Sequence, residues 1–460
     1  MDRLLKFSAL IVIALICVTG TYSARGMYAD GSYWLVEMLS RGGFYIFDSH
    51  RAYVQILVQA PVVIAILFGE LDLNSLIRLQ SFGFVGVPLV FWLGALALHY
   101  KSRLFWFFLM ALTVSYLRAN FFAAGEFSVA YGMTAFCTAV LLRQQISYTQ
   151  AMLMVLTAIV LTHSYEATLF LGIFLAVLAG VRLREAPLDQ RGIRLLVLLS
   201  LVIFLISVYT GGRSTFFERA YDGKGAANLS ALTEIHLLYL MAMPVLVTLL
   251  CFEFTRRIRA LLLSCTVMMA LLYVVYAFRW DHTNISYGFY SYAYRTLCCF
   301  LLLGVLSLTT AVRFWPQLFN ASSMPSGASH CVALGAMAFF VTMAALLLHH
   351  TQGYYEWARR FEQEAVSLKK NTPINHTNIN SNHSLTYGYN WGWGNPSLSI
   401  LLRGNAEAMV LNHSDIQSAE SNVYENVRAL DTTVSGAQPE YDLYPLKSFK
   451  KNGLLFFWAN

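Results

Sequence analysis

The stretch FSALIVIALICVTGTYSA (residues 7–24) carries no charged residue and is followed almost at once by YADGSYWLVEMLSRGG (28–43). A helix of about 20 apolar residues crosses the hydrocarbon core of a membrane. The basic start and the closing YSA also resemble a signal peptide. We expect an uncleaved first span over 5–22, with a polar, aromatic-rich segment directly behind it.

The composition extends this expectation to the whole chain. Of 460 residues, 57% are hydrophobic and only 12% are charged, with a mean hydropathy of +0.54. Soluble proteins carry about 25% charged residues. The chain is therefore predicted to be an all-α polytopic protein embedded in membrane lipid.

Eleven apolar runs have the length of candidate spans. They cover 5–22, 81–99, 104–118, 127–142, 149–163, 166–182, 194–210, 233–252, 259–278, 293–312 and 332–349.

Lysine and arginine favour the cytoplasmic side of short loops. With a cytoplasmic N-terminus, the basic loops all fall on that side: HYKSR, LLRQQ, RLREAPLDQRGIR, EFTRRIR and VRFWPQ. The opposite loops are longer and mixed in sign. This bias explains the net charge of +7 without a nucleic-acid partner, for which the sequence has no signature.

The run YVQILVQAPVVIAILFG (53–69) is apolar enough to be a further span. A span there would turn the later basic loops outward. We therefore predict a helix lying at the outer face or dipping into it, with Pro61 breaking a straight crossing.

The character of the sequence changes near residue 350. Residues 1–350 form the predicted transmembrane domain, with 23–80 as its first outer loop and juxtamembrane helices. Residues 351–460 are rich in Asn, Ser and Thr and nearly balanced in charge. They are predicted to form a small mixed domain or tail on the periplasmic side.

Asp30 stands out because a carboxylate beside a span is costly unless it faces water, a partner or a cavity. The segment SYWLVEMLSR behind Gly31 is amphipathic, and RGG is predicted to end its helix. Asp30 then lies at a helix start, where it either caps free N–H groups or acts as a general base at the membrane surface.

Two further outer segments concentrate polar groups. RANFFAAGEFSVAYG holds Arg118 and Glu126, which either form an ion pair closing the loop or belong to a site. AFRWDHTNISYGFYSYAYR supplies a set of polar residues among aromatics: Arg279, Asp281, His282 and Arg295. Arginine suits bidentate phosphate binding, although an interfacial aromatic belt has a similar composition.

Several chemistries are disfavoured. His163 and Glu166 have helical spacing but no third ligand nearby in sequence, so no metal site is predicted. The chain has no P-loop, G-x-G-x-x-G, G-x-S-x-G or H-E-x-x-H motif. Carriers place charges within their spans, whereas the predicted spans are almost free of charge.

Over residues 1–145 the sequence resembles the GT-C membrane glycosyltransferases, in the branch of protein O-mannosyltransferases and aminoarabinose transferases. The correspondence rests on four stretches in order: the acid of YADGSYW, the turn SRGGF, the apolar APVVIAILFG and the Arg-containing LIRLQSF. Glu126 in AAGEFSVAYG matches the family's second acid. The family often has Glu after the first Asp, where this chain has Gly31.

The resemblance implies a sugar donor on polyprenyl phosphate and a glycan or lipid acceptor at the outer face of a bacterial inner membrane. Asp30 would take the acceptor proton in an inverting displacement, and Glu126 would orient the acceptor or hold a divalent cation, the only cofactor implied. Cations for the leaving phosphate would come from Arg279, Arg295, Arg118 and Arg51, beside Asp281 and His282.

Two alternatives stay open. A ligase or polymerase of lipid-linked oligosaccharides relies on outer-loop Arg and His without an essential carboxylate. A non-catalytic glycan or lipid transporter requires a polar central pathway.

Overall fold

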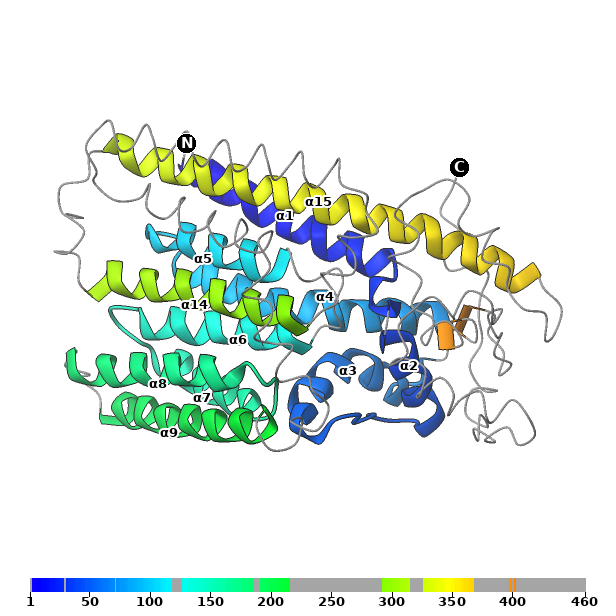
Figure 1. The fold of residues 1–460 in the computed structure, drawn as a ribbon, viewed down its shortest axis with the longest axis horizontal. Helices are drawn as coiled ribbons and strands as arrows, with labels where there is room; N and C mark the ends of the chain where they lie inside the picture. Colours follow the sequence, from blue (N-terminus) through cyan, green and yellow to red (C-terminus); the bar gives the residue numbers. More distant parts are fainter. Residues whose placement is uncertain are drawn as a thin grey trace. The chain divides into compact units, whose positions relative to one another are not determined.

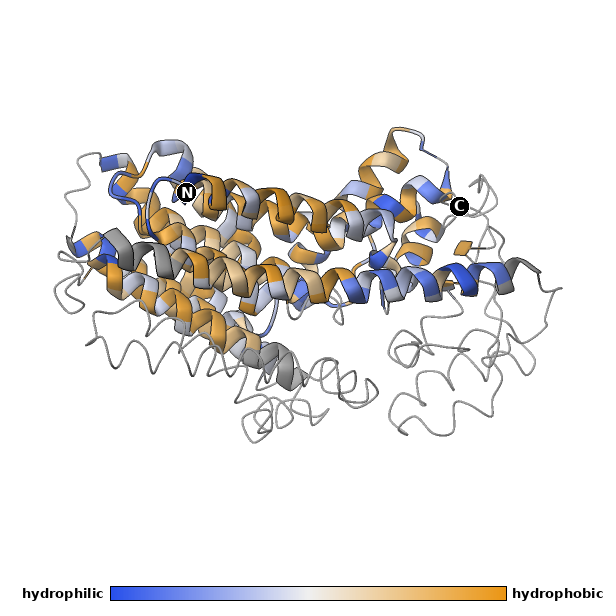
Figure 2. Ribbon diagram, turned by 90° about the horizontal axis from the view of Figure 1, so that it is seen from above, coloured by the Kyte–Doolittle hydropathy of each residue, from blue (hydrophilic) through white to orange (hydrophobic). Residues whose placement is uncertain are grey.

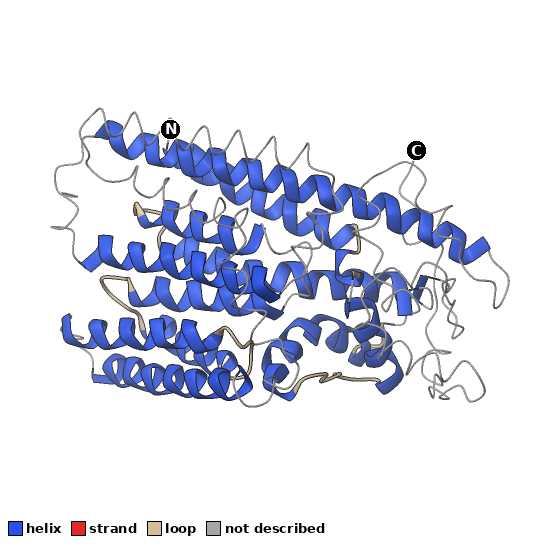
Figure 3. Ribbon diagram, in the orientation of Figure 1, coloured by secondary structure: helices blue, strands red, loops and turns tan. Residues whose placement is uncertain are grey.

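The computed structural model describes residues 2–28, 30–70, 72–117, 126–185, 191–215, 292–314, 326–367, 397–398 and 401–402. Helices make up 88% of the interpretable residues, and no strand is drawn among the described segments (Figure 3). Within these ranges, five segments are long and apolar enough to cross a membrane: Asp2–Tyr22, Ser49–Leu67, Leu73–Leu98, Arg191–Arg213 and Ala333–Gln363. The all-α prediction is therefore confirmed for the described part.

Nine of the eleven predicted runs fall on described helices. These are α1 (Asp2–Tyr22), α4 (Leu73–Leu98), α5 (Leu104–Leu112) continued by the π-helix η3 (Thr113–Leu117), α6 (Glu126–Leu141), α7 (Tyr148–Leu161), α8 (Thr168–Glu185), α9 (Arg191–Arg213), α14 (Tyr292–Phe314) and α15 (Ser326–Ser367). The runs 233–252 and 259–278 lie outside the described residues.

Three predicted boundaries need correction. The 53–69 run is the continuous helix α3 (Ala52–Leu67), which Pro61 does not break. A proline removes one helical hydrogen bond, which kinks a helix without necessarily ending it. Helix α4 begins at Leu73, well before the predicted 81, and α15 continues past 350 to Ser367. Figure 2 shows α15 changing from apolar to polar along its length.

The chain divides into two compact units, which are described separately. The first contains 1–16, 47–55 and 87–347. In it α8 packs against α9, α7 against α9 and α6, and α14 against α5 (Figure 1). Aromatic and aliphatic side chains of α5 and α6 are almost entirely buried.

In the first unit, arginine side chains donate hydrogen bonds to backbone carbonyls at or near the carboxyl ends of helices. Arg143 Nη1 donates to the carbonyl of Leu98 (3.0 Å), the last residue of α4. Arg313 Nε donates to Leu142 O (3.2 Å), directly after α6, and Arg182 Nη2 to Gln144 O (2.6 Å). The last carbonyls of a helix lack intrahelical partners, so the bonds of Arg143 and Arg313 satisfy such groups and complement the negative end of the helix dipole. The bond of Arg182 is to the loop that follows α6.

The second unit contains 17–46, 56–86 and 348–460, of which the described residues are considered. It holds a 3-10 turn η1 (Arg25–Met27) and the helix α2 (Asp30–Arg41). Helices α3 and α4 pack closely in this unit. A Cβ at Gly83 of α4 would lie only 2.0 Å from the carbonyl oxygen of Val58 in α3. Gln59 of α3 is fully buried and bonds both backbone groups of Tyr45, at 2.8 and 2.7 Å.

Candidate functional site

Asp30 is the first residue of α2 and is half-buried. A carboxylate in a first helical turn is stabilised by the positive end of the helix dipole. At the other end, Gly42 takes the left-handed conformation (φ +64°), and Gly43 N–H donates to Met38 O at 3.2 Å. This is the Schellman ending that glycine favours. The predicted helix and its RGG stop are thus confirmed.

Close packing explains why position 31 is a glycine. A Cβ at this position would lie 1.7 Å from the carbonyl oxygen of Gly26, which is impossible for any side chain. Gly26 in turn rests on α4, where its own Cβ would lie 2.5 Å from Ser81 Cα. An acidic side chain directly after Asp30 therefore has no room here.

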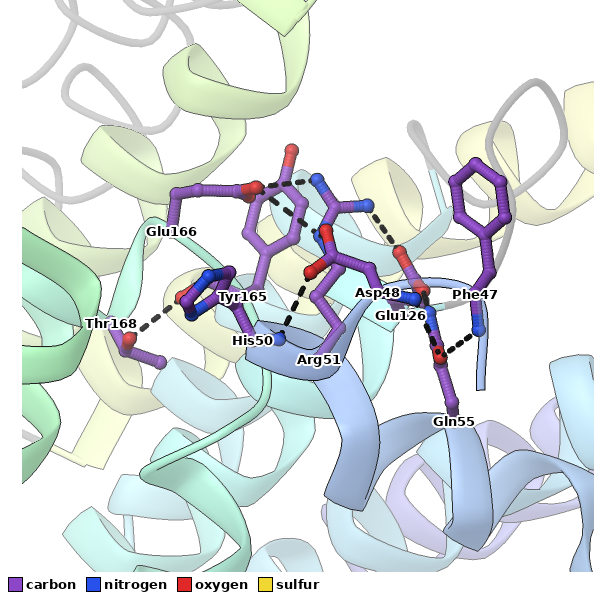
Figure 4. A network of polar contacts seen from close by, with 9 residues as sticks. All are labelled: Phe47, Asp48, His50, Arg51, Gln55, Glu126, Tyr165, Glu166 and Thr168. Atoms are coloured by element: carbon purple, nitrogen blue, oxygen red, sulfur yellow. Dashed lines mark hydrogen bonds and ion pairs between the residues drawn. The ribbon is translucent and has the colours of Figure 1, made fainter. Parts of the chain in front are cut away.

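Arg51 is the centre of a group of polar residues in the first unit that includes the predicted Glu126 (Figure 4). Its Nη1 donates to Glu126, and its Nη2 and Nε donate to Glu166 Oε1 at 2.6 and 3.2 Å. Asp48 Oδ2 lies 3.6 Å from Nε. The Arg51 and Glu126 side chains are only 9% and 5% exposed. We call Asp48, Arg51, Gln55, Glu126 and Glu166 the Arg51 cluster.

Gln55 completes the environment of Glu126. Its side-chain N–H donates to Glu126 Oε1 at 2.6 Å, and its oxygen accepts from the backbone N–H groups of Phe47 (3.0 Å) and Asp48 (3.3 Å). Both Glu126 oxygens thus receive a donor, from Arg51 and from Gln55. Because Glu126 is the first residue of α6, the cluster fixes the start of that helix to the segment 47–55.

The rim of the cluster is aromatic and contains histidine. The Arg51 guanidinium lies over the Tyr165 ring at 4.9 Å. Tyr53 N–H donates to His163 O at 3.2 Å, and the two rings lie 4.8 Å apart. Burial lowers the pKa of His163 below its usual 6.5, and the nearby His50 lowers it further. Both effects favour the neutral imidazole.

The structure brings together two of the predicted site residues, Arg51 and Glu126. In it, the Arg51 guanidinium donates to the carboxylates of Glu126 and Glu166, and its contact with a phosphate stays a prediction. Asp30 belongs to the second unit. Arg118, Arg279, Asp281 and His282 lie outside the described residues, and so does the proposed Arg118–Glu126 pair. Arg295 lies in α14, and its side chain is not described.

The sequence contained a signal for Gln55 that composition alone obscures. Arg51, Gln55 and Gln59 follow one another at four-residue intervals through an apolar run. That spacing places them on one helical face. The part of Glu166 was missed because its partner is 115 residues away in sequence.

Each oxygen of Glu126 accepts one hydrogen bond within the cluster, from Arg51 and from Gln55. Within the described ranges, no three or more His, Cys, Asp or Glu residues are grouped to hold a metal ion. No protein-family model, curated protein or solved structure matches the chain.

Proposed function

We propose that the protein is a multi-span glycosyltransferase of a bacterial inner membrane, with a cytoplasmic N-terminus and a periplasmic C-terminal region. It transfers a sugar from polyprenyl phosphate to a cell-surface glycan or lipid. One observation carries the proposal. Along the chain, the two helices α2 and α3 follow the long apolar helix α1 and precede the long apolar helix α4. Helix α2 begins at the half-buried Asp30.

In the proposed reaction, Asp30 accepts the proton of the acceptor hydroxyl as its oxygen attacks the anomeric carbon. The bond between that carbon and the phosphate oxygen breaks, and the lipid phosphate leaves with the bonding electrons. The configuration inverts. Arg279, Arg295 and Arg118 are the proposed cations for the developing phosphate charge. Glu126, held by Arg51 and Gln55, orients the acceptor.

The test uses the full chain in lipid vesicles with a panel of radiolabelled polyprenyl-phosphate monosaccharides and a bacterial envelope glycolipid fraction as acceptor. We expect labelled acceptor to form, and Asp30→Asn to slow transfer by about 10²–10⁴-fold, the usual contribution of a general base. Glu37→Gln is the matched control, because Glu37 is a second carboxylate of α2 that pairs with Arg41 at 3.0 Å. Full transfer by Asp30→Asn would overturn the proposal.

The same comparison separates the alternatives. A ligase that relies on Arg and His retains its activity in Asp30→Asn. A transporter moves labelled lipid or glycan across the vesicle membrane without forming a new glycosidic bond.

A further inference from the structure

The segment before Asp30 is held from two sides. We call residues 24–28 the elbow. On one side lies α4, where Ser81 Oγ accepts the Gly26 N–H at 3.1 Å. On the other side lies the polar half of α15, where Tyr354 Oη reaches the carbonyl of Ala24 at 3.5 Å and Arg25 Nη1 reaches Thr351 Oγ1 at 3.4 Å. All these groups belong to the second unit.

The backbone of the elbow is in an uncommon conformation. Ala24 has φ +54°, in the left-handed region, which is sterically unfavourable for a residue other than glycine. Such a residue persists only where its surroundings enforce the conformation, and these positions concentrate at functional sites. Here Ala24 is fully buried, and its carbonyl faces the Tyr354 hydroxyl.

The α15 side of the elbow is an aromatic ladder. Tyr354, Trp357 and Phe361 are nearly or completely buried, and successive rings stack with centroids 6.0 and 5.2 Å apart. Tyr28 of the elbow meets Tyr354 edge-on at 5.8 Å. Edge-to-face aromatic pairs have a defined geometry, so the ladder fixes the place of Tyr28 as well as burying it.

The elbow passes this constraint on to α2. Gly31 N–H donates to Tyr28 O at 3.2 Å, and the Gly26 carbonyl lies against the Cα of Gly31. No side chain separates these backbones. A shift of the elbow therefore moves the first turn of α2, which carries Asp30.

From this geometry we infer that Tyr354 and Ser81 are positioning residues for Asp30, acting through the elbow. The inference rests on the proposed function and extends it, because it gives the polar half of α15 a part in the reaction. A general base works only within hydrogen-bond reach of its proton, and misplacement by about 1 Å costs on the order of 10²-fold in rate.

The experiment compares Tyr354→Ala, Tyr354→Phe and Ser81→Ala in the vesicle transfer assay. We expect Tyr354→Ala to lower kcat about tenfold or more with KM for the donor within about twofold, since orientation and not binding is lost. Tyr354→Phe keeps the ring and should recover most of the rate. Ser81→Ala changes the opposite side of the elbow and should also lower kcat. The control is Tyr355→Ala, which truncates the same residue type at the next, less buried position of α15.

A second measurement does not depend on activity. Hydrogen exchange at the backbone amides of residues 31–34 should become faster in Tyr354→Ala and Ser81→Ala, and stay unchanged in Tyr355→Ala. Unchanged exchange, or wild-type kcat in folded Tyr354→Ala and Ser81→Ala, would overturn the inference. If Asp30→Asn is inactive while these variants transfer normally, only the inference fails. If Asp30→Asn transfers fully, the proposed function itself fails.

Discussion

Arg51 donates two hydrogen bonds to Glu166, from Nε at 3.2 Å and from Nη2 at 2.6 Å, while its third nitrogen donates to Glu126. Removing one partner of a buried ion pair leaves uncompensated charge and costs about 3–5 kcal/mol. We expect Arg51→Ala to lower the free energy of unfolding by about this amount, measured by denaturant or thermal unfolding in detergent. Arg51→Lys keeps the charge without the fork and should lose less.

The matched control is Arg41→Ala. Arg41 also forms a two-nitrogen pair, with Glu37 at 3.1 and 3.0 Å, but its side chain is 56% exposed. Glu37 is buried, with 8% of its side chain exposed, but because Arg41 itself reaches solvent we expect a smaller loss than for Arg51→Ala. Equal losses of unfolding free energy in Arg51→Ala and Arg41→Ala would show that the Arg51 cluster does not stabilise the first unit.

Gly31→Ala should be severely destabilising. The added methyl would lie 1.7 Å from Gly26 O, and that oxygen belongs to backbone packed on α4. Overpacking usually costs about 1–3 kcal/mol, and a backbone neighbour that cannot rotate away places this case at the upper end. Gly43→Ala is the comparison, since nothing lies within 4 Å of its Cβ position. A thermal midpoint for Gly31→Ala equal to that of Gly43→Ala would contradict the close packing.

Gln55→Leu should destabilise the segment 47–55. The change keeps the size of the side chain but removes the acceptor for Phe47 and Asp48 N–H and the donor to Glu126. A buried polar group left without a partner costs about 1–3 kcal/mol. The amides of Phe47 and Asp48 should exchange hydrogen faster. Gln352→Leu, at an exposed position, should leave exchange and stability nearly unchanged. Slow exchange of the Phe47 amide in Gln55→Leu would argue against the bond.

His99 should make stability depend on pH. Burial lowers its pKa below 6.5, the charges of Arg143 and Arg313 add to this, and the hydrogen bond to Ala139 partly opposes it. The folded protein then binds fewer protons than the unfolded chain just below 6.5. The contribution of His99 is complete above pH 6.5 and is lost as pH falls toward the folded pKa.

The measurement is the thermal midpoint from roughly pH 5 to pH 8, the range in which histidine titrates. His99→Gln should show a smaller fall toward low pH than the wild-type protein. Parallel curves for the two proteins would contradict the buried neutral imidazole.

Periodicity predicted the helices because each apolar run is a local signal. It gave α2 and its glycine stop, since the amphipathic pattern and RGG lie within one short segment. It did not give the extent of α15, because the polar half keeps helical geometry by packing Tyr354 and Trp357 against distant chain. The Arg51–Glu166 pair was also out of reach, since its residues are 115 apart in sequence. The Gly26–Gly31 contact is local, but it depends on the backbone of the turn at Arg25–Met27, which periodicity does not report.

Two arginines at the helix ends contribute both to membrane orientation and to folding. Arg143 and Arg313 belong to the basic loops that predict orientation, and both also close the carboxyl end of a helix. A charge-reversal experiment on topology would therefore damage folding at the same time. Replacing Arg143 by lysine preserves the orientation signal while altering the bond to Leu98, and glutamine preserves hydrogen bonding while deleting the charge. Together the two variants separate insertion from assembly.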